Sequence, residues 1–387
     1  MLPRGDFTLH EDQVGYSSVR VATFPLVICE TPPGGILRRL VAMTLAISLL
    51  VVACGEEDTS VPISSSVVQG KITLVTNNAF SDVDYLLDPF TIQSGVEVEV
   101  IAGGSAGSMV NQVILTKDNP LGDVVYGFDN TFLSRLLEED LFIPYQSPNA
   151  AMLPTEFQMD TKNRVTAVDF GDVCINYDKA FFEDAGLAVP ADLDDLKKPE
   201  YFGLLAVENP ATSSPGLAFM LATIAEYGED DWLAYWEALR GNGVEIAPGW
   251  EEAYYTNFSL HGGGQPLVVS YASSPPAEVI FSEPMPNVAP SGVIQSSCFR
   301  QIEFIGILRG TENLPAAQAL VDWWLTDAMQ AELPLNYFVF PVNPNVVLPD
   351  SFVEHTVIPS NPYFLDPDLI AKNRDRWIKE WTDVILR

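Results

Sequence analysis

An aromatic pair beside two carboxylates is the group of residues best suited to bind a ligand. In the segment 248–254, PGWEEAY, a helix is predicted to begin at Trp250, and Tyr254 lies one turn later. A spacing of four places both rings on one helix face. Two interpretations stay open: the rings continue a core stripe to Phe258, or Trp250 projects into a cleft. A large aromatic face next to Glu251 and Glu252 suits a flat cation.

Two serine-rich segments precede predicted helices and offer hydrogen-bonding groups. Ser213-Ser214-Pro215-Gly216 opens one helix, and Ser273-Ser274-Pro275 repeats the pattern later. Hydroxyl caps and exposed N–H groups at a helix N-terminus can hold an anion or a neutral hydroxyl. An ordinary N-cap with proline in the first turn explains either segment alone. Two such segments at one cleft favour a ligand site.

A third segment, Gly103-Gly104-Ser105-Ala106-Gly107, fits the G-x-S-x-G pattern of a nucleophile elbow between a strand and a helix. A catalytic triad would also need His261 or His355 and a later acid. A flexible turn at the edge of a cleft explains the same residues. A serine esterase is therefore an alternative function of another class. The sequence contains no P-loop, dinucleotide fingerprint or zinc-ligand spacing, so we expect no cofactor and no metal.

Strand-like and helix-like runs alternate along residues 71–387 and predict an α/β protein built from βαβ units. The strand-like runs are 71–77, 96–102, 123–128, 165–170, 173–178, 204–208, 244–247, 266–272 and 298–308. The predicted helices are 131–141, 215–227, 230–240, 315–325 and a C-terminal helix with an apolar stripe at Leu369, Trp377 and Trp381. Ligand residues are expected where strands end, at 128–130, 208–216 and 270–275.

The N-terminal region has the layout of an export signal. Arg38-Arg39 precede an apolar run from Leu40 to Ala53, and LVVAC at 50–54 resembles the lipobox of bacterial lipoproteins. The run of roughly 14 residues is shorter than the roughly 20 that span a bilayer. We predict a leader and lipoprotein signal peptide at 1–53, then a lipidated Cys54 and a flexible tether to residue 70. Residues 1–36 make a poor signal, which favours a translation start further downstream.

Composition limits the partners of the chain. It has 52 Asp+Glu against 20 Lys+Arg, and the whole excess of 32 negative charges follows residue 53. Such a surface repels nucleic acid and attracts cations, although an acidic surface that aids solubility is the simpler explanation. Residues 71–387 exceed the size at which one core stops growing, so two domains are expected.

Cys174 and Cys298 are the two cysteines left after the leader and the lipid-bearing position. In an exported protein they could form a disulfide. Two buried free thiols explain them equally well. The sequence leaves both alternatives open.

Six segments, in this order and spacing, carry a family resemblance: GFDN (127–130), VDFGDVCINYDK (168–179), ENPATSSPGLAF (208–219), PGWEEAY (248–254), VSYASSP (269–275) and FVFPVNPNVVLP (338–349). They resemble periplasmic thiamine-binding proteins of ABC importers over nearly all of residues 71–387. The resemblance implies a two-lobed periplasmic-binding-protein fold of type II, with mixed sheets, a hinge and an interlobe cleft. Lobe 1 would comprise 71–165 plus about 305–387, and lobe 2 about 166–304.

The resemblance implies a substrate-binding receptor that is not an enzyme. We expect a monomer. The lipobox-like segment ending at Cys54 further implies that it is exported and lipid-anchored to the cell membrane on the extracytoplasmic side. It would bind thiamine, a thiamine phosphate or a related aromatic cation between the lobes and deliver it to an ABC permease. The implied ligand-binding residues are Asp129, Asn130, Ser213, Ser214, Trp250, Tyr254, Tyr271, Ser273, Asn77 and Phe338. Asp129 would face the cation, and Trp250 and Tyr271 would supply the aromatic and hydroxyl contacts. The family often has tyrosine where this chain has Asn77, and tryptophan where it has Phe338.

A ferric-iron receptor of the same superfamily is an alternative, because iron-binding relatives use adjacent tyrosines and this chain has Tyr254-Tyr255. Adjacent helix residues point about 100° apart, so both tyrosines could ligate one ion only with special geometry. The histidine nearest to them in the sequence is His261.

Overall fold

The computed structural model describes residues 70–81 and 83–387. The predicted signal peptide, Cys54 and nearly all of the predicted tether therefore lie outside the described residues. Within those residues, none of the helices combines the length and the apolar character needed to cross a membrane.

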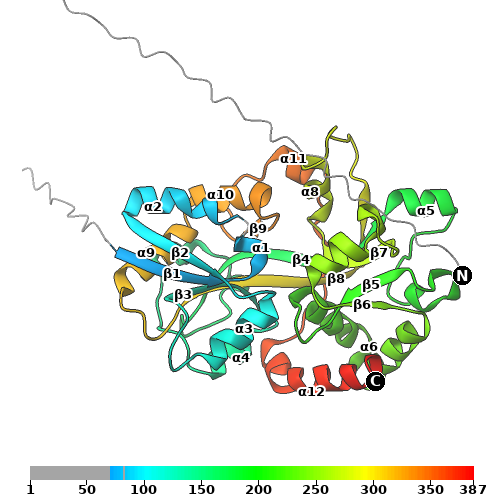
Figure 1. Ribbon diagram of the computed structural model, residues 1–387, viewed down its shortest axis with the longest axis horizontal. Coiled ribbons are helices and arrows are strands. Elements are labelled where there is room, and N and C mark those ends of the chain that lie inside the picture. Colours follow the sequence, from blue (N-terminus) through cyan, green and yellow to red (C-terminus); the bar gives the residue numbers. More distant parts are fainter. Residues whose placement is uncertain (1–69, 82) are drawn as a thin grey trace, which may run out of the picture. The chain divides into compact units, whose positions relative to one another are not determined.

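The described residues form a nine-stranded mixed sheet with helices on both faces (Figure 1). The strand order is β2-β1-β3-β8-β4-β7-β5-β6, and β9 pairs with β4. The strands are β1 Gly70–Thr76, β2 Val96–Ala102, β3 Val124–Asp129, β4 Thr166–Asp178, β5 Leu205–Glu208, β6 Glu245–Ala247, β7 Leu267–Tyr271, β8 Ser291–Ile307 and β9 Phe340–Pro341. Parallel pairs join β1 to β2 and β3, and β5 to β6 and β7. The other pairs are antiparallel.

The two long strands β4 and β8 connect the two ends of the sheet. The C-terminal part of β8 pairs with β3, whereas the C-terminal part of β4 pairs with β7. The sequence pattern predicted two strands, at 165–170 and 173–178, and this was wrong. The intervening Gly171-Asp172 continues the ladder with β8, so both runs belong to β4. Because the sheet is continuous through β4 and β8, the lobe boundaries stay a prediction.

A disulfide joins Cys174 to Cys298, and so decides between the two alternatives that the sequence left open. The ladder explains why these residues meet. Val173 lies opposite Phe299 and Ile175 lies opposite Ile294, so β8 has several extra residues at this point. Cys298 belongs to this bulge and lies with its Cα 4.1 Å from that of Cys174. The bond therefore ties together the two strands that run through both ends of the sheet.

The helices cover the sheet from both faces (Figure 1). They are α1 Asn78–Ser81, α2 Asp88–Ser94, α3 Ala106–Leu115, α4 Leu133–Glu138, α5 Lys179–Ala185, α6 Ser214–Gly241, α7 Trp250–Glu252, α8 Ser274–Ile280, α9 Leu314–Trp324, α10 Asp327–Asn336, α11 Asp350–Val353 and α12 Pro367–Ile385. The two helices predicted at 215–227 and 230–240 are both present within the range of α6. They are separated by a kink at Gly228, whose backbone is not helical and whose φ of 73° suits glycine.

The C-terminal helix α12 packs on α4 and α6. Trp377 and Trp381 are fully buried, as their spacing predicted. Leu369 is 38% exposed, so its place in the predicted stripe was wrong. Ile370 is buried instead, because it lies seven residues before Trp377 and therefore shares its face.

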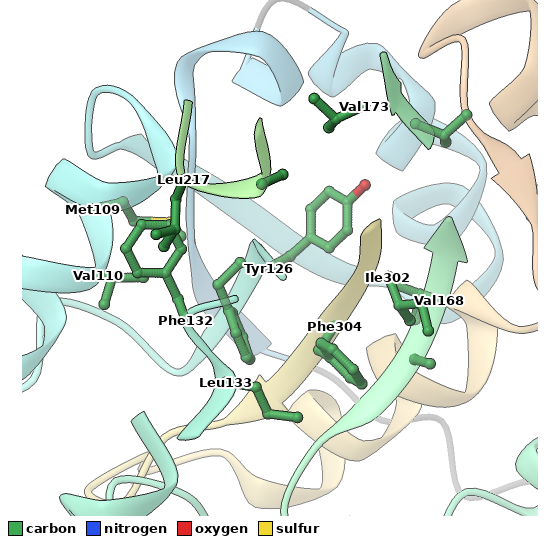
Figure 2. Close-up of a cluster of buried hydrophobic side chains, with 14 of the residues drawn as sticks. Met109, Val110, Tyr126, Phe132, Leu133, Val168, Val173, Leu217, Ile302 and Phe304 are labelled. Carbon is green, nitrogen blue, oxygen red and sulfur yellow. The ribbon is translucent and has the colours of Figure 1, made fainter. Parts of the chain in front are cut away.

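A large apolar core runs along the sheet (Figure 2). Figure 2 shows Leu217 of α6 beside Met109 of α3 and Phe132, which precedes α4. Tyr126 of β3 lies in the same cluster, with a hydroxyl group at the far end of its ring. Because this ring is completely buried, its hydroxyl needs a partner inside the protein.

Candidate functional site

A cavity of about 540 Å³ lies where several strands end and helices begin. Its size is typical of a pocket for a small organic ligand. Eight of the residues implied by the resemblance line it: Asn77, Ser213, Ser214, Trp250, Tyr254, Tyr271, Ser273 and Phe338. The other two, Asp129 and Asn130, are not among the lining residues.

The aromatic wall of the cavity is built around Trp250. Its ring stacks on Tyr254 with centroids 5.0 Å apart and 17° between the planes, so the two rings share a face as predicted. Tyr255 packs edge-on against the indole at 5.4 Å. The indole N–H donates to Ser270 Oγ at 2.9 Å. These contacts hold the ring in one orientation at the wall of the cavity.

The serine segment before α6 behaves as predicted. Ser213 is the N-cap, and its Oγ accepts from the Gly216 N–H at 3.4 Å. A Cβ on Gly216 would lie 2.5 Å from the Glu208 carbonyl oxygen, so this close approach requires glycine. Ser214 also lines the cavity, and its buried hydroxyl has no hydrogen-bond partner within the described part of the chain. That hydroxyl is therefore an unsatisfied polar group beside the cavity.

The second serine segment does not repeat this arrangement, and the expectation of a second hydroxyl cap was wrong. Ser273 precedes α8, but its Oγ donates to the Phe338 carbonyl oxygen at 2.5 Å and caps nothing. The physical reason is the sequence of the first turn. Pro275 and Pro276 occupy its second and third positions and have no N–H to offer a cap. Ser274 instead hydrogen-bonds to Ser270 Oγ at 2.9 Å.

The floor of the cavity carries two carboxyl groups that were not among the predicted ligand residues. Asp169 of β4 and Glu303 of β8 lie opposite each other in the antiparallel ladder, and both line the cavity. The Tyr126 hydroxyl donates to Asp169 Oδ2 at 2.8 Å, and Gln301 Nε2 donates to Glu303 Oε1 at 3.3 Å. Burial raises the pKa of Asp169 to about 7. Burial and the neighbouring Asp169 raise the pKa of Glu303 well above its usual range.

Two tyrosines and an amide complete this part of the site. Tyr337, which follows α10, lines the cavity, and its hydroxyl lies 3.3 Å from Asn77 Nδ2. Asn77 also donates to the Gly127 carbonyl oxygen and accepts from the Phe80 N–H, so it caps α1. The Tyr271 hydroxyl lies 3.4 Å from Gln301 Nε2. Asn77 stands where the family resemblance suggested a tyrosine. Its side chain contacts the Tyr337 hydroxyl, so a tyrosine still lies at this part of the cavity.

Asp129 and Asn130 are turned into the protein. Asp129 Oδ1 accepts from the Thr131 N–H at 2.7 Å and from its hydroxyl at 2.5 Å. Burial raises the pKa of Asp129 to about 6, although the bonds from Thr131 oppose this shift. The Asn130 side chain accepts from the Ile302 N–H and so bridges to β8. Glu303 therefore lines the cavity, whereas Asp129 does not. Asp129 lies opposite Glu303 in the antiparallel ladder of β3 and β8.

The arrangement around Ser105 does not resemble a catalytic triad. Ser105 Oγ donates to the Thr212 carbonyl oxygen at 2.5 Å and lies 3.1 Å from Ser108 Oγ. His261 packs against Tyr254, Tyr255 and Phe258. Across the described residues, no interaction joins Ser105 to a histidine.

The tyrosine pair proposed for iron also differs from a metal site. The rings of Tyr254 and Tyr255 are perpendicular, with centroids 5.3 Å apart. The buried Tyr254 hydroxyl donates to Glu278. Residues 70–81 and 83–387 contain no group of three or more His, Cys, Asp or Glu side chains that could hold a metal ion.

The missed carboxylates carried a signal in the sequence. Asp169 lies within the apolar run VTAVDF, and Glu303 lies within CFRQIEFIGIL. A charged residue is rare inside a buried strand unless it is paired or functional. We expected ligand residues at the ends of strands. Asp169 and Glu303 instead lie inside the long strands β4 and β8, at the points where these strands line the cavity.

A mixed α/β sheet with two long shared strands, and a ligand-sized cavity beside them, is the architecture of periplasmic binding proteins. The family model described as bacterial extracellular solute-binding protein matches residues 119–373, and the chain belongs to this family. The predicted fold class is thereby confirmed. The protein is a solute-binding receptor of an ABC importer and is not an enzyme. It works outside the cytoplasm, where it binds a small solute for delivery to the transporter.

Individual relatives agree with this assignment. The chain is 28% identical to the thiamine-binding periplasmic protein of Escherichia coli over 299 residues, which cover 77% of this chain and 87% of that protein. A solved periplasmic thiamin binding protein matches with a TM-score of 0.73 and 25% identity, over 82% of this chain and 96% of that one. The apo ferric ion-binding protein A of Pasteurella haemolytica has a TM-score of 0.64 and 17% identity, over 81% and 97% of the two chains, and shows the shared fold alone. The esterase alternative is not retained.

Proposed function

We propose that the protein binds thiamine, a thiamine phosphate or a related aromatic cation in this cavity and delivers it to its ABC permease. The observation that carries the proposal is the pairing of an oriented aromatic wall, Trp250 on Tyr254, with buried carboxyl groups in one ligand-sized cavity. Several relatives bear the name thiamine-binding periplasmic protein, which supports the same ligand class.

The chemistry of thiamine matches these groups. Thiamine is a permanent cation with two flat rings and an alcohol tail, so it needs aromatic faces, negative charge and hydroxyl partners. Trp250 and Tyr271 provide ring faces, and Ser214 has a hydroxyl to offer. Asp169 and Glu303 provide the negative charge that the sequence had assigned to Asp129. Closure of the two lobes over the ligand would complete the site.

Binding is tested by calorimetry on the purified protein with thiamine, thiamine monophosphate, thiamine diphosphate, isolated pyrimidine fragments and ferric iron. We expect saturable binding of at least one thiamine compound and an increase in melting temperature with its concentration. Binding of iron with a tyrosinate charge-transfer band, and of no thiamine compound, would refute the proposal and favour the iron alternative.

We also propose that Cys54 carries lipid and anchors the receptor to the membrane as a monomer. The support is the sequence LVVAC preceded by an apolar run and Arg38-Arg39. Several acyl chains hold a protein on a membrane stably, whereas one chain does not. Cys54→Ser should move the protein from the membrane fraction to the soluble fraction. A wild-type protein found soluble, with no lipid mass on its N-terminal peptide, would contradict the anchor.

A further inference from the structure

Asp169 and Glu303 form a carboxyl pair on the cavity floor, and none of the basic side chains in the described part of the chain is a source of their pKa shifts. They lie directly opposite each other on neighbouring antiparallel strands. Like charges in such cross-strand positions destabilise a sheet. Asp169 is fully buried and Glu303 is 6% exposed, so solvent screens their repulsion little. A pair of this kind is stable only if a proton or a cation reduces its charge.

One oxygen of each carboxyl group has no hydrogen-bond partner among the described residues: Asp169 Oδ1 and Glu303 Oε2. Both residues line the cavity. Unpartnered buried oxygens cost free energy, and they are rare in proteins unless they have a function. A proton held between the two carboxyl groups would reduce this cost in the absence of a ligand, and a positively charged ligand group beside the pair would reduce it after binding.

The groups around the pair are neutral or acidic. Tyr126 and Asp129 face it from β3, Tyr271 faces it from β7, and Tyr337 faces it from the segment after α10. Among the described residues, no Lys, Arg or His is a source of the pKa shifts of Asp169 or Glu303. Burial raises the pKa of Asp169 to about 7, and the pKa of Glu303 is raised as well. Around neutral pH the pair therefore retains a proton.

We propose that Asp169 and Glu303 together receive the positive group of the ligand, and that they share a proton which this group displaces on binding. The inference rests on the proposed function, because it takes a thiamine-like cation as the ligand. Before binding, the pair with one proton carries a single negative charge. After binding, the proton has left to the solvent, and two carboxylates face one cation, so the net charge at the site is conserved.

This exchange makes binding depend on pH in a defined direction. Below the pKa of the shared proton, affinity should rise by up to about tenfold per pH unit, because each bound ligand must release a proton. Above that pKa the affinity should become constant. An ordinary exposed carboxylate, with a pKa near 4, would give constant affinity from about pH 6 to about pH 8.

The test is calorimetry of thiamine binding to the whole protein in two buffers that differ in ionisation enthalpy. At a pH below the midpoint of the affinity change, the wild type should release about one proton per thiamine. Asp169→Asn and Glu303→Gln should each release almost none. Glu312→Gln, an exposed carboxylate outside the cavity, is the matched control and should behave as the wild type. A neutral isostere of thiamine, with carbon in place of the thiazolium nitrogen, should release no proton from the wild type.

The outcomes separate this inference from the proposed function. Thiamine binding without proton release, and with constant affinity over the same pH range, overturns the shared proton and leaves the proposed function intact. Absence of binding of thiamine and of both its phosphates by the wild type overturns both. Asn and Gln retain oxygen acceptors for Tyr126 and Gln301, so we expect folded variants, and their melting temperatures check this. If the variants do not fold, the number of protons that the wild type releases with thiamine, compared with the number released with the neutral isostere, still tests the shared proton.

Discussion

Replacing Trp250 with alanine tests the placement of the ligand most directly. The ring is fixed by its stack on Tyr254, by the edge of Tyr255 and by the hydrogen bond to Ser270. A bound ligand therefore meets a preorganised surface and needs little ordering of this side chain. Truncation removes the surface and leaves Tyr254 without its stacking partner.

The expected loss follows from these contacts. A desolvated cation on an indole face contributes about 2 kcal/mol. Ring stacking of the kind that a pyrimidine or thiazolium can make adds about 0.5–1.5 kcal/mol. The sum of roughly 2.5–3.5 kcal/mol corresponds to a thiamine Kd about 70 to 370 times larger in Trp250→Ala. This range is typical of a buried aromatic anchor.

Calorimetry of thiamine binding measures this change, with the melting temperature of the ligand-free protein as the check on folding. Trp250→Phe is the matched control. It keeps an aromatic face but loses the N–H donated to Ser270, so we expect a loss of less than about tenfold. A folded Trp250→Ala protein whose Kd changes by less than about threefold would refute the placement of the ligand on this wall.

Three further predictions concern stability. The pKa of Asp169 is raised from 3.8 to about 7 in the folded protein. The protonated carboxyl group therefore adds to the free energy of unfolding below about pH 4, and this contribution is lost as pH rises towards 7. The urea midpoint of the wild type should decrease between about pH 5 and about pH 8, and that of Asp169→Asn should decrease less. An equal decrease in the two proteins would contradict the raised pKa of Asp169. Cys174 and Cys298 are 124 residues apart, and reducing the disulfide between them should lower the free energy of unfolding by about 2–4 kcal/mol. Alkylation mapping of the unreduced protein should find neither of these cysteines reactive. Trp381→Ala should cost about 3–5 kcal/mol in urea unfolding, because the ring is fully buried, and a loss below about 1 kcal/mol would mean that it is not a core residue.

Local sequence patterns were sufficient to predict the roles of residues whose partners are close to them in the chain. The spacing of Trp250 and Tyr254 predicted their shared face, because helical geometry alone determines it. Ser213 was recognisable as an N-cap, since its partner lies three residues away. Ser273 has the same local pattern but a different role, because its hydroxyl reaches the Phe338 carbonyl oxygen 65 residues away.

The carboxylates show why the rest could not be predicted. The family resemblance implied Asp129 as the cation partner, yet Asp129 does not line the cavity, and its Oδ1 accepts hydrogen bonds from Thr131 two residues later. Asp169 and Glu303 lie 134 positions apart in the sequence, and only the register of β4 against β8 places them opposite each other. A shift of one residue in that register would turn one of them to the other face of the sheet.

The sequence by itself determined the α/β class, the excess of acidic residues and the family resemblance, which in turn implied eight residues that line the cavity. The first two follow from periodicity and composition, and the resemblance follows from short motifs of a few residues each. Only the tertiary structure decided that Cys174 is bonded to Cys298, that β4 is one strand, and that Asp169 and Glu303 line the cavity side by side. Each of these depends on how distant strands are aligned, and the alignment is set by packing of the whole core.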